Sequence, residues 1–203
     1  DTAVVKIAVN DGKAIKNDLI YGSVSGKKVD EDGNALGGAM IGLFRTDDGE
    51  FTKENALMTT TSAEDGSFSF ENIPCGTWYV REIEQPTGFV LDDTIYPVTI
   101  GTDGQVVEIE IVNEYGRGNI HLTKVDSEYP DNKLTGAVFE VYKDSNNNSK
   151  LDEGDELLGT LTEKEIGEYG MNDLFYGRYF VKETKAPDGF VLCLLYTSPS
   201  PRD

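Results

Sequence analysis

IPCGTWYVREIEQPTGFVL, residues 73–91, recurs in the same chain as LFYGRYFVKETKAPDGFVL, residues 174–192. In each copy a run of alternating apolar and polar residues follows a Gly-containing turn and ends at a Pro-x-Gly-Phe segment. Such alternation is typical of a half-buried β-strand. A second matching pair precedes these copies, GSVSGKKVDEDGNALGGA at 22–39 and GNIHLTKVDSEYPDNKLTGA at 118–137. The chain therefore contains two copies of one β-rich unit.

The copies are about one hundred residues apart, which is the size of one small β-sandwich. The segments between them are short and carry turn signals such as Asp32-Gly33 and Asp65-Gly66. No segment has sustained helical periodicity, although Thr162–Glu168 is compatible with a short helical turn. We therefore expect an all-β fold of tandem sandwich modules: 1–20 as the last strands of a preceding module, 21–116 as a complete module, and 117–192 as a second module without its final strands. Short joins between modules predict a stiff rod.

The amino-acid composition excludes several classes of function. The chain has 203 residues, 37 of them acidic and 18 basic, with a formal charge of −19. This balance argues against nucleic-acid binding and against anionic membranes, because both require a basic face. A hydrophobic content of 38% indicates a packed core rather than a disordered acidic tail. No apolar run approaches the roughly 20 residues that span a bilayer, so we expect no membrane insertion.

The last residues, CLLYTSPSPRD at 193–203, differ abruptly in composition from the repeat. This string matches a translated reading frame of a common sequencing adapter over its whole length. We therefore expect adapter read-through in place of natural protein; the alternative is a natural linker rich in Pro and Ser. On this expectation Cys193 is foreign to the protein, Cys75 is the sole native thiol, and the second module is truncated near Leu192.

Five polar residues fall on strand faces that are otherwise largely apolar, because side chains alternate between the two faces of a strand. They are Lys28 and Lys124 in the first strands of the two modules, Glu82 and Glu183 in the quoted repeat, and Asn113 in the last strand of the complete module. Each is preceded, two and four positions earlier, by mainly apolar residues. The complete module thus directs a Lys, a Glu and an Asn into one core.

Two interpretations of this buried trio remain open, since burying such groups without partners is costly. The first is a Lys–Glu pair that is hydrogen-bonded to the Asn. The second is a reaction: burial lowers the pKa of a lysine and raises that of a glutamic acid, a neutral amine is a nucleophile, and a protonated carboxyl can polarise the amide and transfer protons. The product would be a Lys–Asn isopeptide bond with loss of ammonia, formed once and without turnover.

The chain resembles the B-type repeats of the collagen adhesin and the prealbumin-like SpaA-type pilin domains. The resemblance covers nearly all of 21–192, and its motifs are Lys28-Val-Asp-Glu-Asp-Gly, Tyr79-Val-Arg-Glu82-x-x-x-Pro86-x-Gly88-Phe89 and Tyr179-Phe-Val-Lys-Glu183-Thr-Lys-Ala-Pro187-Asp-Gly189-Phe190. It implies an Ig-like or prealbumin-like sandwich with an internal cross-link between Lys28 and Asn113, promoted by Glu82. In the second module it implies the same roles for Lys124 and Glu183, with the acceptor Asn beyond the truncation. Asn17 would be the acceptor of the preceding module.

One loop has the spacing of a calcium site. Oxygen ligands occur at positions 1, 3, 5, 9 and 12 of the segment, which are Asp144, Asn146, Asn148, Asp152 and Asp155. The usual turn glycine and the bidentate Glu are replaced by Ser149 and Asp155, so an acidic hairpin loop is the alternative. We expect no required cofactor and name Ca²⁺ as the candidate metal.

These features together favour a structural stalk or pilin-like shaft at the cell surface or cell wall of a Gram-positive bacterium. Its partners would be neighbouring modules of the same chain. A second hypothesis is an adhesin whose modules bind a host or cell-surface ligand directly. A third is a prealbumin-like carrier or enzyme, which would need a pocket with convergent polar groups. One histidine and no metal-ligand cluster give a hydrolase little support, so we expect a non-enzyme.

Overall fold

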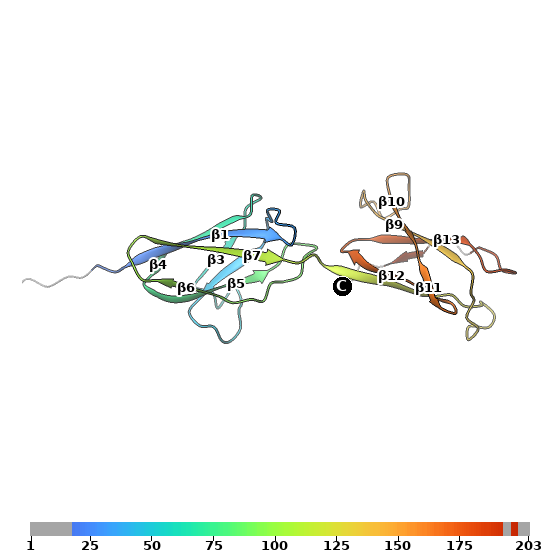
Figure 1. The fold of residues 1–203 in the computed structure, drawn as a ribbon, viewed down its shortest axis with the longest axis horizontal. Helices are drawn as coiled ribbons and strands as arrows, with labels where there is room; N and C mark the ends of the chain where they lie inside the picture. The colour runs from blue at the N-terminus through green and yellow to red at the C-terminus, as the bar shows by residue number, and fades with distance from the viewer. Residues whose placement is uncertain (1–17, 193–195, 199–203) are drawn as a thin grey trace, which may run out of the picture. The chain divides into compact units, whose positions relative to one another are not determined.

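The computed structural model describes residues 18–192 and the backbone of 196–198. These residues form β-strands and no helix, so the all-β prediction is confirmed (Figure 1). Residues 1–17, which include Asn17, and residue Cys193 lie outside the described part. In that part, no helix has the length and apolar character that crossing a bilayer requires.

The described chain separates into two compact units. One comprises the residues up to Gln85 together with Leu91–Val112, and the other comprises Pro86–Val90 and the residues from Asn113 onward. Asn113 is nevertheless the last residue of a strand of the first unit, and is described below with that strand.

The first unit contains two sheets. In one sheet the strand order is β4-β1-β7, and in the other it is β3-β2-β5-β6. β1 pairs antiparallel with β4, and β5 lies antiparallel between β2 and β6. The strand bounds are β1 (Tyr21–Asp30), β2 (Met40–Phe44), β3 (Met58–Thr61), β4 (Ser67–Pro74), β5 (Gly76–Glu84), β6 (Tyr96–Ile100) and β7 (Gln105–Asn113).

The core of the first unit lies between these sheets and follows from the alternation along each strand. Alternate residues of β5 are buried from Trp78 to Glu82, and β4 and β7 show similar alternation over parts of their length. Gly26 faces the same core: a Cβ atom placed there would lie 2.0 Å from the ring of Phe68, so only glycine leaves room for this ring. The apolar core residues are Val24, Ala39, Ile41, Leu43, Phe68, Phe70, Ile73, Trp78, Val80, Val98, Ile100 and Ile111.

The second unit repeats this plan with strand orders β10-β9-β13-β14 and β11-β12-β8. The strand bounds are β8 (Arg117–Thr123), β9 (Val138–Lys143), β10 (Glu156–Thr160), β11 (Thr162–Glu165), β12 (Glu168–Phe175), β13 (Tyr179–Lys185) and β14 (Tyr196–Ser198). Its core residues are Ala137, Phe139, Val141, Leu161, Tyr169, Leu174, Tyr179 and Val181. The repeated segments therefore form equivalent strands, β1 with β8 and β5 with β13.

Strand β14 occupies the edge of β13, the place that β6 takes beside β5 in the first unit. Its three residues belong to the segment 193–203 that resembles adapter sequence. Almost every residue carries the backbone N–H and C=O groups that pair two strands, so foreign and natural residues could both form this strand. That residues 193–203 are adapter read-through therefore stays a prediction.

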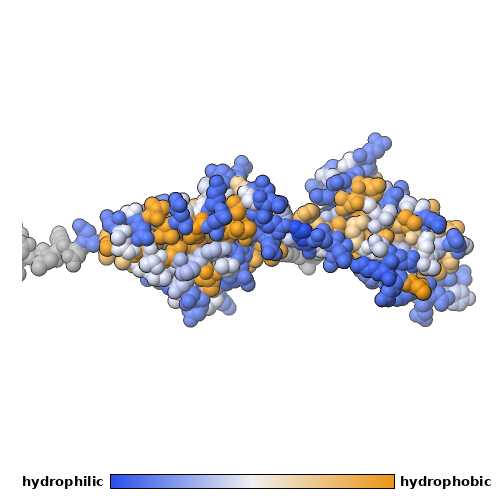
Figure 2. Space-filling view, viewed as in Figure 1, coloured by the Kyte–Doolittle hydropathy of each residue, from blue (hydrophilic) through white to orange (hydrophobic). Residues whose placement is uncertain are grey.

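Polar residues cover much of the visible surface, in keeping with the strongly acidic composition (Figure 2). Apolar patches interrupt this cover in both units. The exposed large apolar residues of the second unit include Leu157, Ile166 and Phe175.

Candidate functional site

Three strands carry the polar trio of the first unit. Lys28 lies near the end of β1, Asn113 ends β7 in the same sheet, and Glu82 lies on β5 in the opposite sheet. All three residues are buried, as their strand positions predict. The lysine and the asparagine thus come from neighbouring strands, while the carboxyl reaches them from across the core.

The lysine amine lies between the carboxyl group and the last strand. Lys28 Nζ is 3.9 Å from Glu82 Oε1 and donates a hydrogen bond to the carbonyl oxygen of Ile111 at 3.1 Å. Ile111 and Asn113 are two residues apart on β7 and are both buried, so they face the same side of the strand. The amine is therefore held beside the part of β7 from which Asn113 projects.

A loop segment after β5 contacts the other two members of the trio. The backbone N–H of Asp92 donates to Glu82 Oε2 at 2.8 Å. Asn113 Nδ2 donates to the carbonyl oxygen of Val90 at 2.5 Å. Two nearby backbone groups therefore fix the orientation of both the carboxyl and the amide.

Burial shifts two pKa values at this site. Desolvation lowers the pKa of Lys28, and the nearby carboxylates of Glu82 and Asp92 oppose this by favouring the ammonium form. Desolvation also raises the pKa of Tyr96, and a hydrogen bond to Asp92 adds to the effect. A primary amine with reduced basicity, a carboxyl group and a primary amide therefore share one apolar core, which are the groups an amide exchange requires.

The second unit places the matching lysine and glutamate in direct contact. Lys124 Nζ is 3.0 Å from Glu183 Oε1, and the Glu183 side chain is fully buried. The Lys124 side chain is 17% exposed, whereas that of Lys28 is 0% exposed. The other predicted acceptor, Asn17, lies outside the described residues.

The predicted calcium loop connects β9 to β10, and its side chains bond mainly within the loop. The Asp144 carboxylate is buried, lies 3.3 Å from Arg178 Nη1, and accepts backbone N–H groups. Asn146 and Asn148 donate to Asp152, while Asp155 accepts the N–H of Ser145 and of Asp152. Among the described residues, no group of three His, Cys, Asp or Glu side chains is arranged to hold a metal. Calcium binding by this loop stays a prediction.

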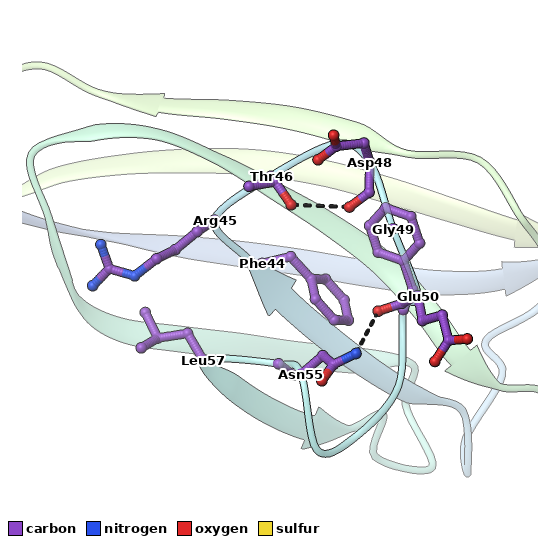
Figure 3. Close-up of a pocket in the computed structure, with 10 residues that line it drawn as sticks. Phe44, Arg45, Thr46, Asp48, Gly49, Glu50, Asn55 and Leu57 are labelled. Atoms are coloured by element: carbon purple, nitrogen blue, oxygen red, sulfur yellow. Dashed lines mark hydrogen bonds between the residues drawn. The ribbon is translucent and has the colours of Figure 1, made fainter.

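An open pocket lies elsewhere on the first unit, within the loop that joins β2 to β3 (Figure 3). Its volume is about 470 Å³, and its lining includes Phe44, Arg45, Glu50 and Leu57. Phe51 packs edge-on against Phe44 at 4.9 Å between ring centroids, which holds the loop against the sheet. None of the buried trio lines this pocket.

Sequence reasoning missed two residues next to the trio, Asp92 and Tyr96. Tyr96 lies two positions before the buried Val98 on β6, so strand alternation carried the signal that it faces inward. Asp92 lies in a loop, where no such periodicity exists. The exposed Cys75 is a free thiol, and the structure gives it no contact with the trio.

A family profile matches most of this chain. The profile of the family described as SpaA, prealbumin-like fold domain, matches residues 22–115 and again residues 118–194. A comparison with curated protein sequences found no match.

A comparison with solved structures also found matches. The Bacillus anthracis TIE protein is 28% identical with a TM-score of 0.70, over 88% of this chain and 31% of that one. A streptococcal ancillary pilin is 27% identical with a TM-score of 0.44, over 91% of this chain and 60% of that one. A variant of the shaft pilin SpaA from Lactobacillus rhamnosus GG is 14% identical with a TM-score of 0.40, over 89% and 95%. This chain therefore spans less than two thirds of the length of the first two proteins. Of the three structures, only the TIE protein has a TM-score above 0.5.

Proposed function

Because the chain belongs to the family of SpaA prealbumin-like fold domains, we propose that it is a structural segment of a stalk or pilus shaft on the surface of a Gram-positive bacterium. Its modules would be joined in series to neighbouring modules of the same chain. Each complete module would be stabilised by one Lys–Asn isopeptide bond that it forms itself. The role is structural, and the bond-forming step occurs once per module.

The proposed reaction in the first unit exchanges one amide for another. The neutral Lys28 amine attacks the side-chain carbonyl carbon of Asn113, while Glu82 in its protonated form donates a hydrogen bond to the carbonyl oxygen. The new bond joins Nζ to that carbon, and the bond from the carbon to Nδ2 breaks. Glu82 transfers one proton from the attacking nitrogen to the leaving nitrogen, which departs as ammonia.

One observation carries this proposal: the buried Lys28 amine is held between Glu82 and the strand that ends in Asn113. It lies 3.9 Å from the carboxyl and 3.1 Å from the Ile111 carbonyl oxygen. Its lowered pKa favours the neutral form that the attack requires. The second unit would use Lys124 and Glu183 in the same roles.

Such a bond would supply the robustness that many small extracellular modules obtain from disulfides. The only cysteine in the described residues is free and exposed. A covalent tie between distant residues restricts the unfolded chain as a disulfide does, with a typical stabilisation of about 2–4 kcal/mol. An amide tie would also persist under reducing conditions.

Intact mass spectrometry of the purified full chain tests the proposal. We expect a mass lower than that of the sequence by one ammonia, and a branched peptide that joins Lys28 to Asn113 after digestion. Glu82→Gln should restore the full mass, because the substituted side chain cannot transfer the proton. Glu84→Gln is the matched control on the exposed end of the same strand and should react as the wild type does. A wild-type chain that keeps the full mass would refute the cross-link and leave the ion pair.

The open pocket in the β2–β3 loop favours a second candidate, an adhesin module that binds a host or cell-surface ligand. A panel of glycans and host-matrix proteins distinguishes the two functions. Saturable binding by the full chain that is lost in Phe51→Ala, a variant that releases the loop, would favour the adhesin. Binding that is absent, or unchanged by this substitution, would favour the stalk.

A further inference from the structure

The loop after β5 is itself anchored by an acid and a phenol. Tyr96 Oη donates a hydrogen bond to Asp92 Oδ2 at 2.7 Å. The other carboxylate oxygen of Asp92 accepts the backbone N–H of Thr94 at 3.0 Å. The Asp92 side chain is therefore fully engaged in holding the loop, and its backbone N–H remains for Glu82.

Tyr96 connects this loop to the sheet that carries Glu82. It begins β6, pairs with Val80 of β5, and packs against the apolar core of the first unit. The phenol is thus fixed by its ring, and it offers Asp92 a donor at a defined position. The strand that presents the catalytic carboxyl and the strand that anchors the loop are neighbours.

The same loop orients the acceptor amide. Because Asn113 Nδ2 donates to the Val90 carbonyl oxygen, the nitrogen that would leave as ammonia points toward the loop. The amide oxygen must then point away from the Val90 carbonyl, since the amide is planar. Fixing residues 90–92 therefore fixes the directions in which the amide nitrogen and oxygen point.

We propose that Asp92 and Tyr96 are positioning residues for the formation of the Lys28–Asn113 bond, an inference that rests on the proposed cross-linking function. Tyr96 holds the Asp92 carboxylate, and this contact fixes the loop that supports both Glu82 and Asn113. The two side chains act through the loop: Tyr96 bonds to Asp92, and Asp92 bonds to the backbone of Thr94. Displacing a reacting group by about 1 Å can slow a reaction by roughly a hundredfold, so the loop affects the rate more than the final yield.

The Asp92 charge has a separate effect that a purely structural residue would not have. The ionisable groups that interact with the Lys28 amine are Glu82 and Asp92, and the phenol of Tyr96 contacts this pair through Asp92. The negative charge of Asp92 raises the pKa of Lys28 against the larger effect of burial. Removing this charge lowers the pKa further, so the neutral amine becomes available at lower pH.

The test follows bond formation in the full chain during refolding. Chain recovered unfolded from inclusion bodies, with its unreacted mass verified, is diluted into buffers across a range of pH and sampled by intact mass spectrometry. We expect Tyr96→Phe and Asp92→Ala to slow ammonia loss by roughly tenfold or more. Asp92→Asn should recover most of the rate, because its amide oxygen still accepts the Tyr96 hydroxyl. The acidic limb of its pH–rate profile should shift to lower pH.

Matched controls are Tyr79→Phe on the outer side of β5 and Asp93→Asn, the exposed neighbour; both should react at the wild-type rate. Wild-type rates in Tyr96→Phe and Asp92→Ala would overturn the positioning role while leaving the cross-link intact. Asp92→Asn as slow as Asp92→Ala, with an unshifted pH profile, would also overturn it. A wild-type chain that refolds without losing ammonia would refute the proposed cross-link itself.

Discussion

Lys28 and Lys124 occupy equivalent positions, and their surroundings differ in an informative way. An ammonium group is stable in an apolar core only when a close acceptor replaces its hydration. Lys124 meets this need with a direct contact of 3.0 Å to Glu183 and some solvent exposure. Lys28 is fully buried, lies 3.9 Å from Glu82, and donates to a backbone carbonyl. In the first unit, burial therefore lowers the pKa of Lys28, and its amine has only a distant carboxyl and one backbone carbonyl in place of water.

Gly26 gives a prediction at the same scale. A Cβ atom at this position would lie 2.0–2.4 Å from ring atoms of Phe68, so Gly26→Ala should lower the free energy of unfolding by about 1–3 kcal/mol through overpacking. Urea denaturation of the full chain measures this change. Ser25→Ala, on the exposed face of the same strand, should stay near the wild-type value. The double variant Gly26→Ala with Phe68→Leu should recover part of the loss; no loss in Gly26→Ala would contradict the predicted clash.

Strand alternation explains how much of the site could be predicted. Lys28, Glu82 and Asn113 follow apolar residues at even spacing, and this placed all three in the core. The same rule extends to Tyr96. The role of Asp92 depends on a loop conformation and on a hydrogen bond between residues four apart, for which periodicity gives no information.

One secondary-structure element shows that strand pairing outweighs the local sequence pattern. By its sequence Thr162–Glu168 is compatible with a short helical turn; in the structure residues 166–167 form a turn between two strands, and Thr162–Glu165 form strand β11. It pairs antiparallel with β12, which also pairs with β8. Pairing with a strand already placed in a sheet outweighs a weak local preference, because propensity is context-dependent. The strands of the quoted repeat carried a stronger alternation and were predictable from sequence.

The β9–β10 loop gives a prediction at the scale of elements. If Ca²⁺ replaces the internal hydrogen bonds of Asp152 and its neighbours, binding should raise the melting temperature of the full chain, because a ligand of the folded state stabilises it. Calorimetry with Ca²⁺, with Mg²⁺ and with a chelator measures this. Asp152→Asn should abolish the Ca²⁺ effect, whereas Glu153→Gln, which is outside the predicted ligand set, should keep it. Identical melting curves with Ca²⁺ and with chelator would reject the calcium site.

At the scale of the whole molecule, the repeat and the all-β class were readable from sequence because both depend on patterns that extend over many residues. Family membership covers residues 22–115 and 118–194. The predicted module boundaries, the preceding module at 1–20 and the foreign origin of 193–203 stay predictions. The acidic exterior suits a solvated surface protein, which agrees with the proposed location outside the cell.

The adjacency of β1 and β7 has a mechanical consequence. A bond from Lys28 to Asn113 would join the strand by which the chain enters the first unit to the strand by which it leaves. Tension applied to the two ends would then pass directly across the bond, and the residues between would carry no load. Single-molecule pulling on the full chain should show no extension from residues 29–112 in the wild type, and their release in Glu82→Gln. Equal extension of the wild type and Glu82→Gln would contradict a bond that carries the load. If the two differ as expected, the first unit is an inextensible link in a loaded fibre.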